Sequence, residues 1–266
     1  MDAKATLMSR ATRLVSTVAL LALTLPGCGS LNLIPVSRDS VLGAQSYPEL
    51  LANDPIISSG KDYEMVARMT DNLVAAAKEL DPEIADLFEW EVRLVKRDDI
   101  VNAWCLPGGK MAVYTGILPV AQGETGLAVV MGHEIAHATL RHGTQKMTRQ
   151  MGTAALVAIT AIAVGDNLQE KALAAGIASA AASFVNLSYG RGDELEADAR
   201  GLKYMARAGY DPREAVDFWK RMQAASGGKE PPQWLSTHPS NSTRIEQIEE
   251  LLPEALAIYQ QSGGSN

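Results

Sequence analysis

The sequence is short of histidine, cysteine and positive charge, and each shortage limits what the protein can do. Four histidines and two cysteines occur in 266 residues, so any histidine pattern is informative and at most one disulfide can form. The formal net charge is -7 and no basic block is present, which argues against nucleic acid as a partner. Apolar residues at 47% and charged residues at 21% are typical of a globular domain, not of a disordered chain or a polytopic membrane protein.

The N-terminus has the pattern of an export signal. Basic residues precede an apolar stretch at residues 14–25, which is shorter than the ~20 residues that a membrane-spanning helix needs. The tetrapeptide that ends at Cys28 resembles the bacterial lipobox, so we expect residues 1–27 to be a removed signal and Cys28 to carry lipid. Cys105 would then be a single, buried thiol, and Gly29 suggests the periplasmic face of the outer membrane. The alternative is an ordinary secretion signal with a buried Cys28.

Periodicity predicts an α+β fold, mainly α with one small sheet, in a single domain at residues 61–266. Residues 28–60 contain scattered proline and glycine, and we expect a tether or irregular wrap there. Residues 152–188 consist of two apolar halves, each too short to span a bilayer, which favours a buried helical hairpin and leaves contact with a membrane surface open. The other expected helices are 63–80, 127–141 with Gly143 as its cap, 193–208, 211–225 and 241–259, and the expected strands are 90–94, 101–106 and 111–115 with a turn at 107–109.

One motif in the expected helix 127–141 carries chemistry. His133-Glu134-Ile135-Ala136-His137 is an HExxH pattern, and residues four apart share a helix face, so both imidazoles can bind one metal ion. Glu134 is rotated by ~100° from this face, where it can accept a proton from an attacking water. Two histidines used only for packing, or for a closed structural zinc, are the alternative, but neither has a use for the glutamate.

A catalytic zinc normally takes three protein ligands, so a third ligand is expected elsewhere in the chain. The segment 189–198 offers several carboxylates at a helix start. Glu194 and Asp198 are four apart and share a face, so one can bind zinc while the other accepts the outer N–H of a ligating histidine. Glu196 points away from that face. Taken alone, such a cluster of carboxylates is more often a solvated helix N-terminus. Because the HExxH motif needs a third ligand, a metal-binding role is favoured here.

Four motifs occur in the chain: the HExxH helix, E-x-E-A-D-x-x-G at residues 194–201, N-x-x-x-x-P-G-G at residues 102–109, and Thr237-His238-Pro239 with Arg244. Together they resemble the HtpX/BepA/LoiP/Oma-type zinc metallopeptidases of family M48, which are gluzincins. The resemblance covers roughly residues 63–252, and the chain's layout is similar to that of the short lipoprotein members.

The resemblance implies a minigluzincin-like zincin domain that holds one Zn2+ per chain through His133, His137 and Glu194. It makes Asp198 the partner of a ligating histidine, behind the metal. It also implies an edge strand at Lys110–Thr115 that pairs with an extended substrate, although an ordinary sheet edge is an equal alternative. The implied substrates are misfolded or misassembled cell-envelope polypeptides.

His238 is the last of the four histidines. A lone loop histidine is usually a surface or packing residue, but in the family this one lies near the metal. We therefore assign His238 an active-site role, in which it gates access to the metal, and expect Arg244 to position its loop.

The sequence favours a membrane-anchored zinc metalloendopeptidase, but two other classes stay open. The first is an assembly chaperone with a latent or inactive metal site, and the second is a zinc hydrolase of a non-peptide substrate. In the peptidase mechanism, the zinc site lowers the pKa of water toward ~7, and Glu134 takes its proton.

Overall fold

A computed structural model of the chain describes residues 32–149, 188–226, 232–238 and 243–264. The chain divides into two units, Met1–Leu33 and Ile34–Asn266, and every element below belongs to the second. The expected lipidation site, Cys28, and the expected hairpin at 152–188 apart from Ser188 lie outside the described residues. Among the helices that the structure describes, none is both long and apolar enough to cross a membrane.

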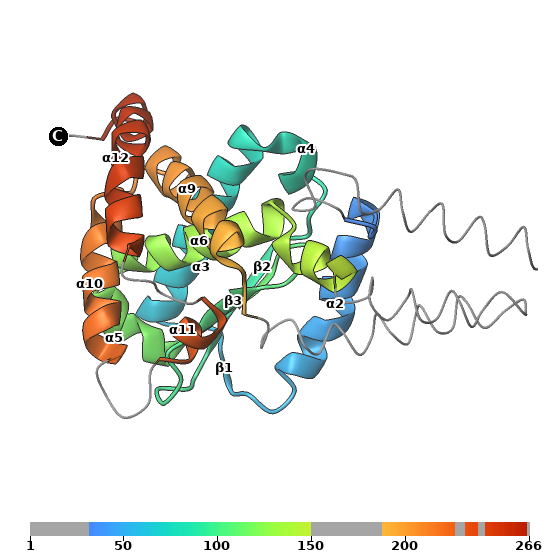
Figure 1. The fold of residues 1–266 in the computed structure, drawn as a ribbon. Helices are drawn as coiled ribbons and strands as arrows, with labels where there is room; N and C mark the ends of the chain where they lie inside the picture. The colour runs from blue at the N-terminus through green and yellow to red at the C-terminus, as the bar shows by residue number, and fades with distance from the viewer. Residues whose placement is uncertain (1–31, 150–187, 227–231, 239–242, 265–266) are drawn as a thin grey trace, which may run out of the picture. The chain divides into compact units, whose positions relative to one another are not determined.

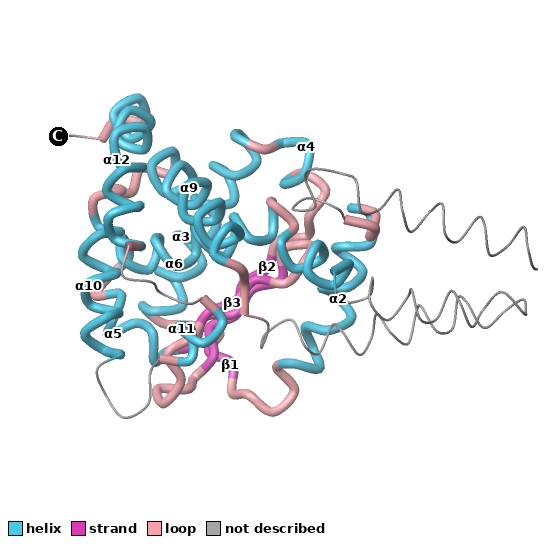
Figure 2. Tube along the Cα trace, in the orientation of Figure 1, coloured by secondary structure: helices cyan, strands magenta, loops and turns pink. Residues whose placement is uncertain are grey.

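The described residues form helices around one small sheet (Figures 1 and 2), which confirms the predicted mainly α, α+β class. The strands are β1 (Ile56–Ile57), β2 (Glu91–Val95), β3 (Ala103–Cys105) and β4 (Lys110–Tyr114). The helices are η1 (Val36–Arg38), α2 (Asp39–Leu50), α3 (Lys61–Leu80), α4 (Pro82–Ala85), η2 (Thr115–Ile117), α5 (Leu118–Ala121), α6 (Glu124–Thr139), α9 (Arg191–Arg207), α10 (Glu214–Ser226), α11 (Gln233–Thr237) and α12 (Arg244–Gln261).

The sheet has the order β1-β2-β4-β3, which corrects the expected place of one strand. The expectation was that residues 110–115 form an edge. Instead, β4 pairs with β2 in parallel on one side and with β3 antiparallel on the other, so it is an interior strand and β3 forms the edge. The parallel pairing depends on the long connection between β2 and β4, which local alternation does not reveal.

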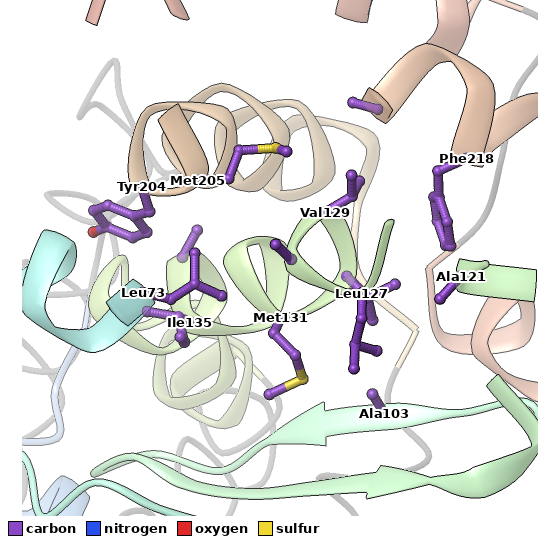
Figure 3. Close-up of a cluster of buried hydrophobic side chains, with 14 of the residues drawn as sticks. Leu73, Ala103, Ala121, Leu127, Val129, Met131, Ile135, Tyr204, Met205 and Phe218 are labelled. Carbon is purple, nitrogen blue, oxygen red and sulfur yellow. The ribbon is translucent and has the colours of Figure 1, made fainter. Parts of the chain in front are cut away.

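Helix α6 runs through the core of the fold. Every residue from Gly126 to Thr139 is buried, because α6 packs against α3, α9, α10 and β3. Figure 3 shows Leu127 and Met131 on the side of the helix that faces Ala103 of β3. A helix that is buried on all sides is held in place by the core around it. The few polar residues of α6 are therefore rigidly positioned and shielded from water.

Two glycines let α6 and α9 approach closely. A Cβ added to Gly201 of α9 would lie 2.8 Å from the carbonyl carbon of Gly132 and 2.8 Å from the backbone nitrogen of His133. Real Cβ contacts are not that short, so only glycine permits this backbone spacing. The contact brings the helix that carries HExxH against the helix that carries the acidic segment.

The end of α6 differs from the prediction. The expected helix ran to Arg141 with Gly143 as its cap, but α6 ends at Thr139, and Arg141 adopts a left-handed backbone with φ 60°. Residues 142–149 then form a new helical segment that contains Gly143. Gly143 is therefore not the cap, and a residue with a side chain occupies the left-handed position.

The segment expected as a tether or irregular wrap, residues 28–60, contains helix α2. An added Cβ at Gly43 would lie 2.2 Å from the carbonyl oxygen of Pro107, so α2 sits directly on the turn between β3 and β4. The hydroxyl of Tyr47 donates a hydrogen bond to the carbonyl oxygen of Met111 over 2.6 Å. Helix α2 is therefore packed on the sheet, in spite of the proline and glycine content of the segment.

Candidate metal centre

Four buried side chains from three parts of the chain meet at one point. His133 and His137 come from α6, Glu194 from the first turn of α9, and His238 directly follows α11. One potential ligand atom of each lies within 4.8 Å of the others, which makes the group a candidate metal site among the described residues. The predicted ligands are thus brought together, with His238 among them.

The distances between these atoms suit a single small cation. Nε2 of His133 lies 2.9 Å from Nε2 of His137 and 3.5 Å from Oε2 of Glu194. Nε2 of His137 lies 3.4 Å from Oε1 of Glu194. Ligand atoms bound to zinc at ~2.0–2.1 Å in tetrahedral geometry lie a little over 3 Å apart, so the cluster is close to that arrangement.

The outer ring nitrogens can carry the hydrogens of both neutral imidazoles, which leaves the inner nitrogens to bind a metal. Nδ1 of His133 lies 2.9 Å from Oδ1 of Asp198, which can only accept, so this nitrogen carries the hydrogen. Nδ1 of His137 lies 3.0 Å from Nδ1 of His142. When both histidines are neutral with hydrogen on Nδ1, two Nε2 lone pairs face each other at 2.9 Å, and a cation between them removes the repulsion.

Arg244 holds the two carboxylates behind the site. Its Nη1 donates to Oε2 of Glu194 over 2.7 Å, and its Nε and Nη2 each donate to Asp198 over 2.8 Å. Its guanidinium carbon lies 3.8 Å from the centre of the Trp219 ring, in a cation–π contact. Arg244 therefore orients Asp198 and Glu194 directly, a role beyond the loop-positioning one expected from the sequence.

The charges in the site keep both carboxylates ionised. Burial alone would raise the pKa of Glu194, but the charge of His238 and the hydrogen bonds from His133 and His137 bring it far below its ordinary value. Burial would likewise raise the pKa of Asp198, and the neighbouring Arg244 and His133 lower it. A cluster of imidazoles and an ionised carboxylate matches the ligands that a zinc ion prefers.

The two helix histidines differ in their affinity for a proton. Burial alone would lower the pKa of His133, but Asp198 and Glu194 raise it to about 9. The pKa of His137 lies well below its ordinary value, because of burial and then the charge on His133. In the metal-free protein His133 therefore carries a second ring proton and a positive charge, whereas His137 is neutral, and a metal that binds between them must displace that second proton.

Glu134 lies beside the cluster and is held by two groups. The indole N–H of Trp234 donates to its Oε1 over 2.7 Å, and Nε2 of His238 lies 3.2 Å from the same oxygen. Glu134 is thus kept out of the ligand set but close to it. This is the placement that its expected role as proton acceptor requires.

His238 faces both the ligands and Glu134. Its Nδ1 lies 3.1 Å from Nε2 of His133 and 3.1 Å from Oε1 of Glu194. Its ring stacks on Trp234 with centroids 5.0 Å apart and an interplanar angle of 29°. The side chain therefore lies where a fourth ligand or a substrate oxygen is needed.

Sequence reasoning missed Trp234, His142 and Tyr189. Tyr189 stacks on the ring of His137 with centroids 3.9 Å apart, and Trp234 comes from a five-residue helix with no periodic signal. Glu196 points away from the ligands as expected, but its Oε2 lies 3.3 Å from Nε2 of His142. The only signal in the sequence for a role of Glu196 near the site was its place in the acidic segment 189–198.

A buried HExxH pair with a glutamate from a second helix is the centre of a zincin-like metallopeptidase domain. Residues 62–252 match Peptidase family M48, and the chain belongs to that family. The recognised family is thereby confirmed, and the predicted enzyme class, a metallopeptidase, is confirmed at the level of the family.

Curated relatives carry related names. The chain is 41% identical to Mitochondrial metalloendopeptidase OMA1 of Schizosaccharomyces pombe over 63% of the chain and 48% of the relative. It is 34% identical to Metalloendopeptidase OMA1, mitochondrial, of Homo sapiens over 82% and 43%. It is 30% identical to the Putative beta-barrel assembly-enhancing protease of Vibrio cholerae over 83% and 46%. The chain spans about half the length of the curated relatives it matches.

The expected location in a bacterial envelope, at the outer membrane, is wrong. The relatives from two yeasts, cattle, human and Arabidopsis thaliana are all named as mitochondrial enzymes. The expectation came from the short pattern around Cys28 and Gly29. Such a pattern is local and does not depend on the folded domain, which is the part these relatives share.

Proposed function

We propose that the protein is a zinc metalloendopeptidase that cleaves misfolded or misassembled polypeptides. The observation that carries this proposal is the facing pair of Nε2 atoms, 2.9 Å apart, with Glu194 beside them and Glu134 held at the edge of the cluster. The names of the relatives support both the proposed activity and the proposed substrate class, since they include metalloendopeptidases and a beta-barrel assembly-enhancing protease.

The ligand set favours zinc over calcium or magnesium. Two neutral imidazoles and a carboxylate from His133, His137 and Glu194 suit zinc, whereas the harder cations prefer oxygen ligands throughout. A zinc ion bound there supplies Lewis acidity to the scissile carbonyl and to water. Asp198 accepts the outer N–H of His133, which keeps the imidazole in the binding tautomer.

Glu134 is the proposed base. An ionised carboxylate next to the ligands accepts the proton of the attacking water and later delivers it to the leaving amine. The hydrogen bond from Trp234 fixes Oε1, so the other carboxylate oxygen is presented to the water in one orientation. This arrangement fixes the orientation of the base before the reaction, which lowers the entropic part of the barrier.

An extended substrate strand would pair with β3, the sheet edge beside α6. Asn102 and Leu106 bond to β4 through the pairs Tyr114 N to Asn102 O and Leu106 N to Lys110 O. The backbone groups of Ala103 and Cys105 therefore face away from β4. The N–H of Ala103 already donates to Oδ1 of Asn102 over 3.0 Å, so a further strand would bond to the carbonyl of Ala103 and to the backbone of Cys105. Pairing by backbone reads few side chains, which suits unfolded segments of varied sequence.

His238 makes the resting site latent in this proposal. Its Nδ1 lies near two proposed ligands and its Nε2 lies near Glu134, so it occupies the space that a substrate oxygen must enter. Displacement of His238 then permits catalysis. The same contact is what favours the second candidate, a chaperone whose metal site stays shut. Attachment to a membrane through lipid on Cys28 remains a further proposal, at a residue outside the described ranges.

The decisive experiment compares substrates as well as metal states. Purified protein is stripped with a chelator, reloaded with zinc, and assayed on an internally quenched peptide with both ends blocked and on one protein in folded and unfolded form. We expect one zinc per chain, and zinc-dependent cleavage of the blocked peptide and the unfolded protein. A protein that suppresses aggregation but cleaves neither substrate is a chaperone, and hydrolysis confined to non-peptide esters indicates a different hydrolase.

A further inference from the structure

The outer nitrogen of His137 bonds to another histidine, unlike that of His133, which bonds to a carboxylate. When His137 binds a metal through Nε2, its Nδ1 carries a hydrogen, so Nδ1 of His142 at 3.0 Å must accept. The hydrogen of His142 is then on Nε2, which lies 3.3 Å from Oε2 of Glu196 and donates to it. His142 is 1% exposed and has its tautomer set at both ends.

His142 reaches His137 only because the helix breaks between them. Five residues along a regular helix rotate a side chain by about 140° away from the starting face, so an unbroken α6 would place His142 on another side. The break is at Arg141, which has φ 60°. Residues other than glycine, asparagine and aspartate disfavour this left-handed backbone conformation, so the surrounding structure must impose it on Arg141.

A buried ion pair holds the break in place. Nε and Nη2 of Arg141 donate to the two carboxylate oxygens of Asp39 over 2.7 and 2.9 Å, and Nη2 also donates to the carbonyl oxygen of Ile34 over 2.6 Å. Asp39 is 0% exposed. A two-point contact between a guanidinium and a carboxylate fixes direction as well as distance, so it constrains the residue that carries it.

Both anchors of Arg141 lie outside the part of the chain that matches the family. The family match begins at residue 62, whereas Ile34 and Asp39 lie in the N-terminal segment Ile34–Leu50. This segment therefore adds a support to the metal helix from beyond the matched domain.

We propose that Asp39 and Arg141 are positioning residues for the metal, which impose the break after α6 and thereby hold His142 against Nδ1 of His137. The inference rests on the proposed metal site, and it makes the segment Ile34–Leu50 part of that site's support. If the Asp39–Arg141 ion pair only attached α2 to the rest of the domain, its loss would lower the stability of the fold but not the affinity for zinc. A positioning role predicts that zinc affinity falls as well.

The test measures the zinc dissociation constant by competition with a coloured chelator, and the melting temperature of the metal-free protein. Asp39→Asn and His142→Ala should each weaken zinc binding by about 10- to 100-fold. His142→Asn should recover most of the loss, since an asparagine oxygen can take the place of Nδ1 as acceptor. The matched control is Asp54→Asn. Asp54 also precedes the region that matches the family, and its Oδ1 lies 3.2 Å from Nη1 of Arg97, which is not among the proposed metal ligands.

Asp54→Asn should lower the melting temperature while leaving zinc affinity within about two-fold of the wild type. The double variant Asp39→Asn/His142→Ala should bind zinc no more weakly than His142→Ala alone, because the two residues act through one contact. Wild-type affinity in both single variants, or equal losses in Asp39→Asn and Asp54→Asn, would overturn the inference. A wild-type protein that binds no zinc would instead overturn the proposed function on which it rests.

Discussion

The indole N–H of Trp234 donates to Oε1 of Glu134 over 2.7 Å, and the same indole stacks on His238. One short helix, α11, therefore supports both the proposed base and the side chain that stands in the ligand cluster. Because Trp234 is fully buried, this link is rigid, and movement of α11 would affect both residues at once.

Trp234→Phe should slow catalysis without loss of metal. The substitution keeps an aromatic ring but removes the donor that orients Glu134, and a hydrogen bond to a charged group contributes enough to predict a roughly 10- to 100-fold fall in kcat. Steady-state kinetics and zinc analysis measure the two quantities. Trp90→Phe, which removes an indole hydrogen bond to the carbonyl oxygen of Ala85, is the control and should leave kcat unchanged. Unchanged kcat in Trp234→Phe contradicts the role.

His238→Ala should raise activity and retain zinc. If His238 occupies the space of the substrate oxygen, its removal opens the site, and the loss of one hydrogen-bonded contact predicts a roughly 2- to 10-fold rise in kcat/KM. Gln233→Ala, an exposed change on α11, the helix that His238 follows, serves as the control. Loss of zinc from His238→Ala would show that the residue is an ordinary ligand and not a gate.

Arg244→Met should strongly destabilise the fold. It leaves Asp198 and Glu194 buried without their cation, a change that costs about 3–5 kcal/mol in comparable cases. Urea unfolding of the metal-free protein measures the difference. Arg68→Met, which removes an exposed partner of Glu124, should cost only about 0–1 kcal/mol. Similar small losses in both variants would mean that the buried carboxylates do not depend on Arg244.

The stability of the metal-free protein should fall with rising pH. The pKa of His133, about 9, lies above its ordinary value of 6.5, so its proton stabilises the fold fully below pH 6.5 and ceases to do so as the pH passes about 9. We expect a loss of about 3 kcal/mol across this window, measured by urea unfolding in chelator. The zinc-loaded protein should lack this loss, because the metal replaces the proton. A free energy of unfolding of the metal-free protein that does not change between pH 6.5 and about 9 contradicts the raised pKa of His133.

The parts of the site that lie close in sequence could be predicted. The four-residue spacing of His133 and His137 defines a helix face by itself, and the need for a third ligand directs attention to Glu194. The main helices likewise follow from their periodicity, as α3 and α9 show within two residues of the expected bounds. These features depend on local geometry, which the chain specifies over a few turns.

The parts of the site and fold that depend on contacts between distant residues could not be predicted from the sequence. Trp234 meets Glu134 across 100 positions, and no local pattern announces that contact. His142 looks misplaced on a regular helix, and only the break at Arg141, held by Asp39, returns it to His137. The order of strands in the sheet is similarly hidden, because alternation predicts a strand but not its neighbours.

The central claim is that Glu134 performs catalysis beside a metal that it does not bind. Glu134→Gln tests it most directly, with zinc content and cleavage of a blocked, quenched peptide measured on the same samples. We predict one zinc per chain in both proteins and a fall of about 10²- to 10⁴-fold in kcat for Glu134→Gln. A variant that keeps its zinc and cleaves the peptide at the wild-type rate would contradict the claim.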